Sequence, residues 1–501
     1  MVFSSLEFIY FFLPPVLLVF LLLRKLQMEG AIIWWLIVAS LGFYAWWNPL
    51  HLVLLMGSVI GNYALHLQLI ARRSKLLLIL GIGANLALLG WFKYIDFLLV
   101  NFNALLGLET AKLGIMLPLA ISFFTFQQVS FLMDTWNDRL EKFDFKRYVL
   151  FVTFFPQLIA GPIVLQKDTI PQFRLASFNS RVSLNLIVGA TLFCIGLFKK
   201  VVLADGIAPI ANAVFGAADA GQVLTMETAW QGALAYSFQI YFDFSGYCDM
   251  ALGLARMFGI RLPINFNSPY KALSISDFWR RWHITLSRFL RDYLYIPLGG
   301  NRSGILGRHG NLLATMVLGG LWHGAGWNFV IWGGLHGGYL VVNHFWRDFS
   351  DAYRLHRFLP ASLRVMVSWF ITMLAVVVAW VFFRAETFAG ALKVLVSMFV
   401  PDFPGVASLQ APLVVDTNST VLTLAAMIVI VTCMPNSIEI TRRYRPVIDT
   451  VRELATSQYF MPRLTWRPVS VWGLVIAVGG TGALIQLYRL NDMSEFIYFN
   501  F

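Results

Sequence analysis

The chain has 501 residues, of which 58% are hydrophobic and 13% charged, with a net charge of +12. Soluble domains carry about 25% charged residues, so this composition excludes an ordinary soluble protein and predicts an integral membrane protein. The positive charge does not indicate a nucleic-acid partner, because Lys and Arg form short clusters between apolar runs and no nucleic-acid-binding motif accompanies them.

Apolar runs of roughly membrane-spanning length recur along the chain, with no internal repeat and no low-complexity linker between them. We therefore expect an all-α integral membrane protein in which residues 1–501 form a single domain of about eleven transmembrane helices. The first run lacks the charged start and the cleavage site of a signal peptide, so we expect an anchor. The predicted spans are residues 8–23, 31–47, 52–70, 76–92, 113–133, 148–164, 183–198, 230–258, 312–345, 365–383, 421–433 and 469–487.

The distribution of Lys and Arg predicts which loops face the cytoplasm. The segment 401–420 has two Asp and no Lys or Arg, so we expect it outside. From the last basic loop, residues 469–487 would cross outward and leave the C-terminal tail, residues 489–501, outside. This tail ends in an apolar aromatic stretch, which we expect to return into the protein or the membrane interface. The predicted cytoplasmic loops are 24–25, 72–75, 139–147, 271–308 and 442–467.

Two segments do not fit a simple spanning helix. Residues 276–283 mix Trp with Arg, which is typical of interfacial helices, so we expect the surrounding stretch 271–308 to lie along the cytoplasmic face or dip into it. Residues 154–162 contain two prolines and a glycine at membrane depth. Irregular backbone at that depth must be shielded by protein or line a cavity, so we expect a re-entrant element that lines a pocket.

Histidines inside apolar stretches are the first candidates for chemistry. His323 lies in residues 319–329, where several small residues open space around it, and ionisable groups at membrane depth are usually functional. The alternative is a packing histidine whose nitrogens bind neighbouring helices. His336 is also at membrane depth, so burial alone does not identify His323. His283, beside Trp and Arg, is equally well explained as part of an interfacial anchor.

Two acidic residues, Asp243 and Asp249, also lie within an apolar run. They are expected either to orient an imidazole or to form structural ion pairs with arginine inside the bundle. The cysteines Cys194, Cys248 and Cys433 are widely spaced in apolar stretches, which favours buried free thiols over a disulfide or a metal site. No nucleotide-binding or zinc-enzyme motif has the context that its chemistry needs, so we expect no metal.

Several motifs are shared with one family of membrane enzymes. They are residues 1–5, 117–127, 155–162, 244–247, 265–270, 277–283, 291–302 and 321–324. With these motifs the chain resembles the bacterial membrane-bound O-acyltransferase (MBOAT) family, and within it the membrane subunits of alginate O-acetyltransferases. The resemblance implies a ring of transmembrane helices, with re-entrant and interfacial helices, around a central tunnel from a cytoplasmic donor site to the outer face.

The resemblance also implies roles for individual residues. His323 matches the essential histidine of the family and His283 its second motif histidine. Residues 494–501 look like a short aromatic acyl-acceptor motif in which Tyr498 holds the acyl group. His323 would then act as the general base toward the phenol of Tyr498.

The implied reaction moves an acetyl group from cytoplasmic acetyl-CoA across the bacterial inner membrane, for O-acetylation of an exopolysaccharide such as alginate or cellulose. Acetyl-CoA is then a substrate, and no tightly bound cofactor is expected. Cytoplasmic arginines are expected to hold the CoA phosphates, because guanidinium groups pair well with phosphate. The predicted substrate-binding residues are Trp279, Arg280, Arg281, Arg288, Arg291 and Asn328.

The implied partners are inner-membrane lipids, a periplasmic serine-dependent (SGNH-like) acetyltransferase and a polysaccharide synthase or secretion complex. Two alternatives remain open. One is transfer of D-alanine or another acyl group to a different cell-envelope polymer such as peptidoglycan or teichoic acid. The other is an ion- or proton-coupled transporter in which His323, His336, Asp243 and Asp249 form the path.

Overall fold

The structure is a computed structural model that describes residues 1–139, 143–302, 304–354, 360–400, 417–448, 466–489 and 496–497. Within these ranges every regular element is a helix, which confirms the all-α prediction. The long helices are α1 (Leu13–Lys25), α2 (Glu29–Ala45), α3 (Pro49–Arg72), α4 (Lys75–Leu89), α5 (Ile95–Leu106), α6 (Ile121–Trp136), α11 (Val182–Phe198), α12 (Asp205–Asp219), α13 (Met226–Met257), α16 (Gly304–His323), α17 (Trp327–Ala352), α18 (Ala361–Arg384), α19 (Phe388–Phe399), α20 (Thr417–Cys433) and α22 (Ser470–Arg489).

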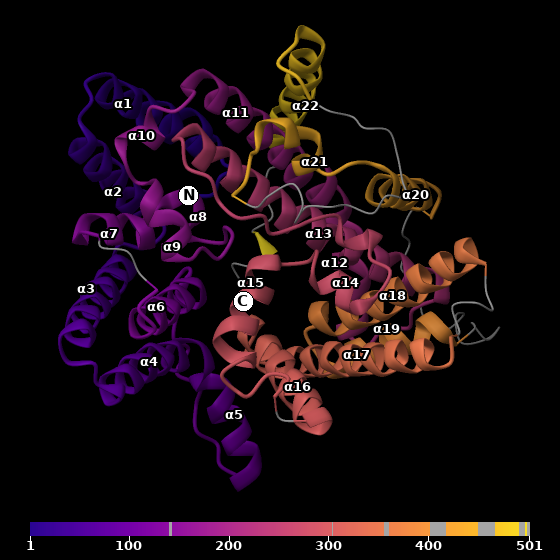
Figure 1. Cartoon of the computed structure of the whole chain (residues 1–501). Helices are drawn as coiled ribbons and strands as arrows, with labels where there is room; N and C mark the ends of the chain where they lie inside the picture. The colour runs from indigo at the N-terminus through magenta and orange to yellow at the C-terminus, as the bar shows by residue number, and fades with distance from the viewer. Residues whose placement is uncertain are drawn as a thin grey trace.

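Short α-helices, π-helices and 3₁₀ turns connect the long helices. Figure 1 shows α1–α5 on one side, α16–α19 on another and α20–α22 on a third, around short helices near the middle of the view. The short α-helices are α7 (Phe145–Thr153), α8 (Phe155–Leu158), α9 (Gln166–Thr169), α10 (Leu175–Phe178), α14 (Ile275–Trp279), α15 (Ile284–Leu290) and α21 (Ser437–Thr441). The π-helices are η1 (Glu7–Phe12), η2 (Gly90–Tyr94), η4 (Lys199–Ala204) and η6 (Arg291–Tyr295), and the 3₁₀ turns are η3 (Ile170–Gln172), η5 (Pro269–Lys271) and η8 (Arg442–Tyr444).

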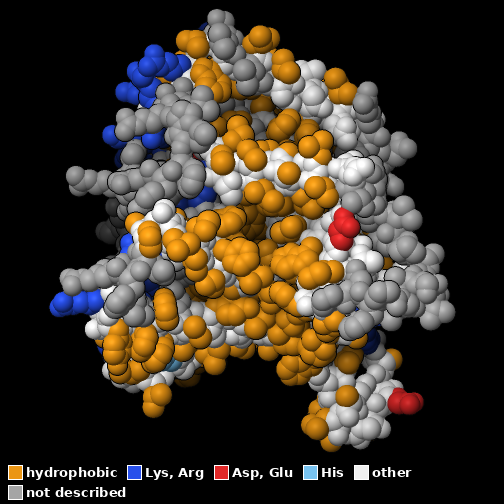
Figure 2. All heavy atoms as spheres, turned by 90° about the vertical axis from the view of Figure 1, so that its right-hand side faces the viewer, with side chains coloured by type: hydrophobic (Ala, Val, Ile, Leu, Met, Phe, Trp, Pro, Cys, Tyr) orange, Lys and Arg blue, Asp and Glu red, His pale blue; other side chains and the backbone are white. Residues whose placement is uncertain are grey.

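Five helical stretches in the described part of the chain are long and apolar enough to cross a membrane, or six if the bent pair Asn418–Cys433 and Ser437–Tyr444 is one span. Figure 2 shows a band of hydrophobic side chains between an edge where Lys and Arg gather and an edge that carries acidic side chains. The predicted count of about eleven spans is not confirmed. The five stretches are Glu7–Lys25, Pro49–Arg72, Lys75–Leu106, Val182–Asp219 and Ala361–Arg384.

Some runs that look continuous in the sequence are interrupted in the structure. The run 148–164 is divided between α7 and α8, and the run 113–133 becomes helical only at Ile121. The helix α2 has only 17 residues, which is short for a membrane span. Hydrophobicity along the sequence does not reveal such breaks, because a buried loop and a buried helix use the same apolar residues.

Helices α11 and α13 approach each other backbone to backbone. A Cβ at Gly189 would lie 2.6 Å from the carbonyl oxygen of Gly253, and a Cβ at Gly196 would lie 2.5 Å from that of Gly246. Small residues permit such close contact between membrane helices. The contact places η4, which continues from α11, directly against the buried middle of α13.

The broken element at residues 154–162 is shielded by protein, as predicted for irregular backbone at membrane depth. Side chains from other elements bind backbone N–H groups in and next to this element. The Phe155 N–H donates to Ser40 Oγ (3.1 Å), and the Ile163 N–H donates to Thr285 Oγ1 (3.0 Å). Burial without such partners would cost free energy for each N–H. The element therefore joins α2 to α15 in the interior.

The Trp- and Arg-rich segment dips into the protein instead of lying along its face. Phe278, Trp282 and His283 are each at most 1% exposed. Trp282 packs on Trp380 with ring centroids 4.9 Å apart, so the tryptophan belongs to the aromatic interior and not to a lipid-facing belt. This inward course brings His283 toward the end of α16.

Candidate functional site

His323 is the last residue of α16, and its side chain is 2% exposed. Aromatic rings surround the imidazole, with ring-centroid distances of 4.9 Å to Trp322, 5.0 Å to Trp332 and 5.2 Å to Phe383. These rings come from α16, α17 and α18, so three helices fix its position. An imidazole in such an apolar cage is kept from bulk water.

The end of α16 is held by a residue that the sequence analysis did not single out. Lys93, in the π-helix η2, directs Nζ to the carbonyl oxygens of Trp322 (2.5 Å) and His323 (3.4 Å). The hydroxyl of Tyr94 donates to the carbonyl oxygen of Leu321 (2.9 Å). The final carbonyls of a helix have no partner within the helix, and a cation there also interacts favourably with the helix dipole. Lys93 and Tyr94 thus anchor the turn that carries His323.

A signal for Lys93 did exist in the sequence. It is an ionisable residue at the end of the apolar run 76–92, and such residues are costly at membrane depth unless they have a function or a partner. What the sequence could not supply was the partner, which is about 230 residues away along the chain.

His283 lies beside His323, with the two ring centroids 6.3 Å apart. Its backbone has φ +44°, a left-handed conformation that is strained for a residue other than glycine and is frequent at functional sites. Its Nδ1 lies 3.1 Å from Asn265 Oδ1, an oxygen that also accepts from the Thr285 hydroxyl (2.9 Å). Because Asn265 Oδ1 acts as an acceptor, His283 Nδ1 carries the proton and Nε2 carries the lone pair.

His336 is equally buried, at 0% exposed, but has different surroundings. Its Nδ1 accepts from the indole N–H of Trp279 (3.3 Å), and its ring is stacked on Phe278 with 6.0 Å between centroids. These contacts give His336 a packing role in the aromatic interior. The structure therefore separates two histidines that burial alone did not separate.

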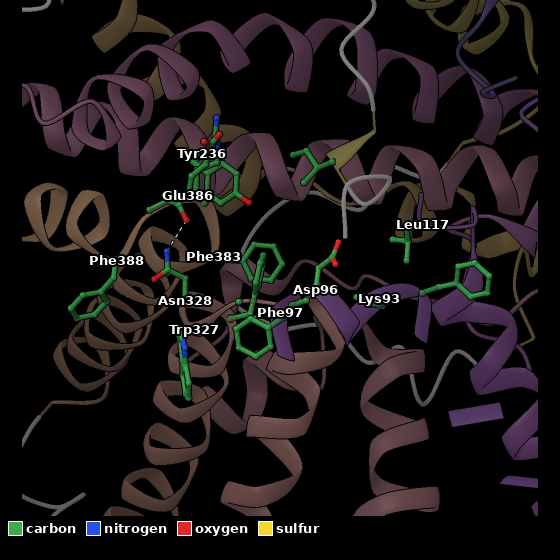
Figure 3. Close-up of a pocket in the computed structure, with 18 of the residues that line it drawn as sticks. Lys93, Asp96, Phe97, Leu117, Tyr236, Trp327, Asn328, Phe383, Glu386 and Phe388 are labelled. Carbon is green, nitrogen blue, oxygen red and sulfur yellow. Dashed lines mark hydrogen bonds between the residues drawn. The ribbon is translucent and has the colours of Figure 1, made fainter. Parts of the chain in front are cut away.

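A cavity of about 940 Å³ adjoins the turn after His323. The glycine-rich turn at 324–326 lines it, as do Lys93, Phe383 and Asn328 (Figure 3). A Cβ at Gly324 would lie 2.1 Å from the Phe329 ring, so a larger residue there would displace that ring. At Gly320, in contrast, a Cβ would lie 2.2 Å from the Phe329 carbonyl oxygen, so that glycine permits contact between α16 and α17 instead of opening space. Volumes of this size are typical of small-molecule sites.

The described end of the C-terminal tail, residues 496–497, enters the protein at this cavity. Phe496 is 3% exposed and stacks on Tyr247 with ring centroids 4.6 Å apart. The Ile497 N–H donates to Asp243 Oδ2 (2.9 Å), and Ile497 lines the cavity. The prediction that the tail returns into the protein is confirmed for these two residues. Tyr498 and the rest of the predicted motif 494–501 lie outside the described residues.

The two buried acids form structural ion pairs, with lysines and not with the expected arginines. Asp249 binds Lys199 Nζ (2.6 Å), and Asp243 binds Lys200 Nζ (2.7 Å), which also binds Asp205 (2.9 Å). Both lysines come from the π-helix η4, and π-helical turns are frequent at functional sites. Of the two roles expected for these acids, the structure has the ion pair, and Asp243 in addition binds the tail.

The residues predicted to bind the substrate are spread over several places. Arg281 is paired with Asp277 (2.9 Å) and Arg291 with Asp292 (2.7 Å), Arg280 is exposed, and Arg288 lies beside a small internal space. Trp279 contacts His336 and Trp332 in the interior. Asn328 lines the large cavity and donates to the Ala385 carbonyl oxygen (2.8 Å). The set does not form one cluster.

Two neighbouring buried imidazoles beside a large cavity, in an apolar helical protein, are features that a membrane-embedded enzyme needs. Residues 118–383 match the family MBOAT, membrane-bound O-acyltransferase. The match covers more than half of the chain and includes both His283 and His323. The chain belongs to the membrane-bound O-acyltransferase family, and it is an acyltransferase.

Curated relatives extend this result beyond the matched region. The chain is 46% identical over 428 residues to a peptidoglycan O-acetyltransferase of Helicobacter pylori, covering 79% of this chain and 80% of that protein. It is 43% identical over 411 residues to a probable alginate O-acetylase, AlgI, of Pseudomonas putida, covering 80% of each chain. A teichoic acid D-alanyltransferase of Streptococcus thermophilus is 29% identical over 239 residues, which cover 46% of this chain and 57% of that protein.

Proposed function

We propose that this enzyme moves an acetyl group from cytoplasmic acetyl-CoA across the bacterial inner membrane, for O-acetylation of a cell-envelope polysaccharide such as alginate or cellulose. The similarity to a peptidoglycan O-acetyltransferase and to a probable alginate O-acetylase supports acetyl transfer to a polysaccharide. The first of these relatives makes peptidoglycan a further polymer to test as the acetyl acceptor.

The observation that carries the proposal is the position of His323. It is buried at the end of α16, 6.3 Å from His283 between ring centroids, and the next residue lines a cavity of about 940 Å³. Such a site excludes bulk water, which would otherwise hydrolyse an activated acyl group. A base next to a cavity is what acyl transfer to a hydroxyl requires.

In the proposed step, the phenol of Tyr498 attacks the thioester. The phenolic proton passes to the His323 imidazole while the phenolic oxygen bonds to the carbonyl carbon. The carbon–sulfur bond then breaks, and the departing thiolate takes the proton from the imidazolium. The resulting aryl ester has a better leaving group than an alkyl ester, so it can pass its acetyl group to a serine hydroxyl of a periplasmic partner.

The contacts of the tail support the choice of Tyr498 as acceptor. Ile497, its neighbour in the chain, lines the cavity and is bound by the buried carboxylate of Asp243. Tyr498 follows Ile497 in the sequence, and it is therefore the acceptor that we propose.

On the donor side, Arg281 and Arg291 are already paired with Asp277 and Asp292, and Arg280 has an exposed side chain that a phosphate can reach. On the outer side, the proposal needs a serine-dependent (SGNH-like) acetyltransferase and the complex that synthesises or exports the polysaccharide. Two-stage transfer of this kind keeps the large charged CoA in the cytoplasm, so that only the acyl group crosses.

The first test replaces His323 with alanine in the full chain. We expect loss of radiolabelled acetyl transfer from acetyl-CoA, while the purified protein keeps its thermal unfolding midpoint within a few degrees. The matched control is His336→Gln, which is equally buried and keeps an acceptor for Trp279 Nε1, and it should retain activity. Full activity of His323→Ala would refute the general-base role.

The second test is Tyr498→Phe, which removes one oxygen and keeps the aromatic ring. If Tyr498 carries the acetyl group, polysaccharide acetylation is lost and the labelled protein intermediate disappears. If it is only an aromatic anchor, activity is retained, and direct transfer from CoA to the partner's serine replaces the acyl-tyrosine step.

The same assay separates the two alternatives. Use of a D-alanyl thioester in place of acetyl-CoA would identify D-alanyl transfer, for which the relatives are less similar. A transporter would cleave no thioester at all.

A further inference from the structure

A second cavity, of about 550 Å³, lies apart from the histidine site and is lined almost wholly by arginines. Five arginines from four segments of the chain contribute to it, with Ser180 and Tyr444 as the remaining lining residues. The five are Arg181 before α11, Arg256 in the last turn of α13, Arg261 in the loop that follows, and Arg443 and Arg445 in and after η8. We call this the arginine pocket.

The arginine pocket is built by contacts that do not depend on the guanidinium groups of its exposed members. Gln172 fixes the backbone of Arg261 by accepting from its N–H and donating to its carbonyl oxygen, both at 2.9 Å. Gly259 in the same loop has a positive φ and packs closely on Ser177. A Cβ there would lie 2.6 Å from the Ser177 carbonyl oxygen, so the contact needs glycine. The Ile448 N–H donates to the Leu262 carbonyl oxygen (3.2 Å), which attaches the segment after η8.

The five positive charges have no acidic counterpart among the described residues. No described carboxylate lies within ion-pair distance of any of them, whereas Lys199, Lys200 and Arg281 each pair with an aspartate. Arg256 is 3% exposed, donates through Nη2 to the Tyr444 carbonyl oxygen (3.3 Å), and has an Nε without a hydrogen-bond partner in the described structure. A buried guanidinium without a counter-charge is costly, and an anionic ligand in the pocket would offset that cost.

The arginines also affect one another. Burial, together with the neighbouring charges of Arg445 and Arg181, lowers the pKa of Arg261 from its ordinary value. Arginine stays protonated at neutral pH despite such a shift, so the pocket concentrates positive charge that an anion would offset.

The arginine pocket lies on the face predicted to be cytoplasmic. Arg443 and Arg445 belong to the predicted cytoplasmic loop 442–467. Asn179, two residues before Arg181, donates to Gln27 Oε1 (2.9 Å), just after the basic pair at 24–25. The loop and the contact both favour the side of the membrane where soluble phosphate esters and anionic lipid headgroups are available.

From this geometry we propose that the arginine pocket binds a phosphate group at the cytoplasmic face. Guanidinium groups bind phosphate oxygens in pairs, and several arginines that converge on one space can hold a doubly charged phosphate ester. Two molecules carry this chemistry here: coenzyme A through its 3′-phosphate and diphosphate, and an anionic phospholipid through its headgroup. The coenzyme A source rests on the proposed function, whereas the lipid source does not.

The test is the double variant Arg443→Gln, Arg445→Gln in the full-length protein, chosen because both side chains are exposed and their loss should leave the fold intact. Arg442→Gln is the control, since it removes one positive charge from η8 at a residue that does not line the pocket. Binding of coenzyme A and of 3′-dephospho-coenzyme A is measured by calorimetry in phosphatidylcholine nanodiscs. Co-purified phosphatidylglycerol is measured by mass spectrometry.

For the coenzyme A source, the double variant should weaken coenzyme A binding by about tenfold or more and lose its preference over the 3′-dephospho form, with lipid content unchanged. For the lipid source, bound phosphatidylglycerol should fall and coenzyme A affinity should stay the same. If neither quantity changes relative to Arg442→Gln, the proposal is wrong. His323→Ala should bind coenzyme A normally, so failure of the acyl-transfer mechanism and failure of the arginine pocket are distinguishable.

Discussion

Replacement of Lys93 by methionine tests whether the end of α16 must be held in place for catalysis. The substitution keeps most of the apolar stem and removes the ammonium group. In the structure, that group binds the carbonyl oxygens of Trp322 and His323 and the hydroxyl of Ser122 (3.2 Å). The loss therefore falls on the one helical turn that carries the proposed base.

The size of the effect follows from these contacts. A hydrogen bond to a charged group contributes about 1.5–3 kcal/mol, and a cation at a helix C-terminus up to about 2 kcal/mol in partly buried positions. Removal of a half-buried ammonium also relieves its desolvation, so we expect a net destabilisation of about 1–3 kcal/mol. A shift of the imidazole by about 1 Å is enough to reduce turnover roughly a hundredfold.

The assay is single-turnover cleavage of acetyl-CoA by purified protein, with thermal unfolding measured in parallel. We expect the rate constant of Lys93→Met to fall by about tenfold to a hundredfold, with a smaller loss for Lys93→Arg, which retains the charge. Lys75→Met, which removes an exposed lysine at the start of α4, is the control. Wild-type turnover in Lys93→Met would show that these contacts do not position His323.

Two further predictions concern the tail and the helix contacts. Asp243→Asn should increase hydrogen–deuterium exchange at the Ile497 amide, because the asparagine amide has one acceptor oxygen where the carboxylate used two, one for Lys200 and one for the tail. Asp205→Asn changes a residue that binds Lys200 but not the tail, so it should not do so, and equal exchange in both variants would contradict this role. Gly333→Ala should destabilise the protein by about 1–3 kcal/mol in thermal unfolding, because its Cβ would lie 2.4 Å from the Met316 carbonyl oxygen. Gly334→Ala has no neighbour within 4 Å at its Cβ and should be nearly neutral; similar losses in both would refute the packing argument.

The local sequence was sufficient for several features because their cause is local. Low charge density and recurring apolar runs identified a helical membrane protein, since a chain of this composition is stable in a lipid bilayer and not in water. Prolines and a glycine at 154–162 predicted a broken, shielded element, because proline has no backbone N–H to donate and interrupts a helix. Motif similarity singled out His323 and His283, and the structure places their rings side by side.

Other features depend on contacts between residues that are far apart in the chain. Lys93 meets the end of α16 across about 230 residues, and Asp243 meets Ile497 across 254 residues. Burial is the same for His323 and His336, and their different neighbouring rings and the cavity beside His323 became visible only in the fold. The predicted number of spans is not confirmed, and apolar runs alone do not settle it, since apolar residues bury loops as well as helices.

The arginine pocket illustrates the same division most clearly. The sequence determined that basic residues would gather on one face, because the positive-inside rule acts on each loop separately. Only the tertiary structure decided that Arg181, Arg256, Arg261, Arg443 and Arg445 would converge on a single space. Convergence requires α11, α13 and η8 to pack together, and that packing is set by glycine contacts and backbone hydrogen bonds, which no pattern of charges along the chain encodes.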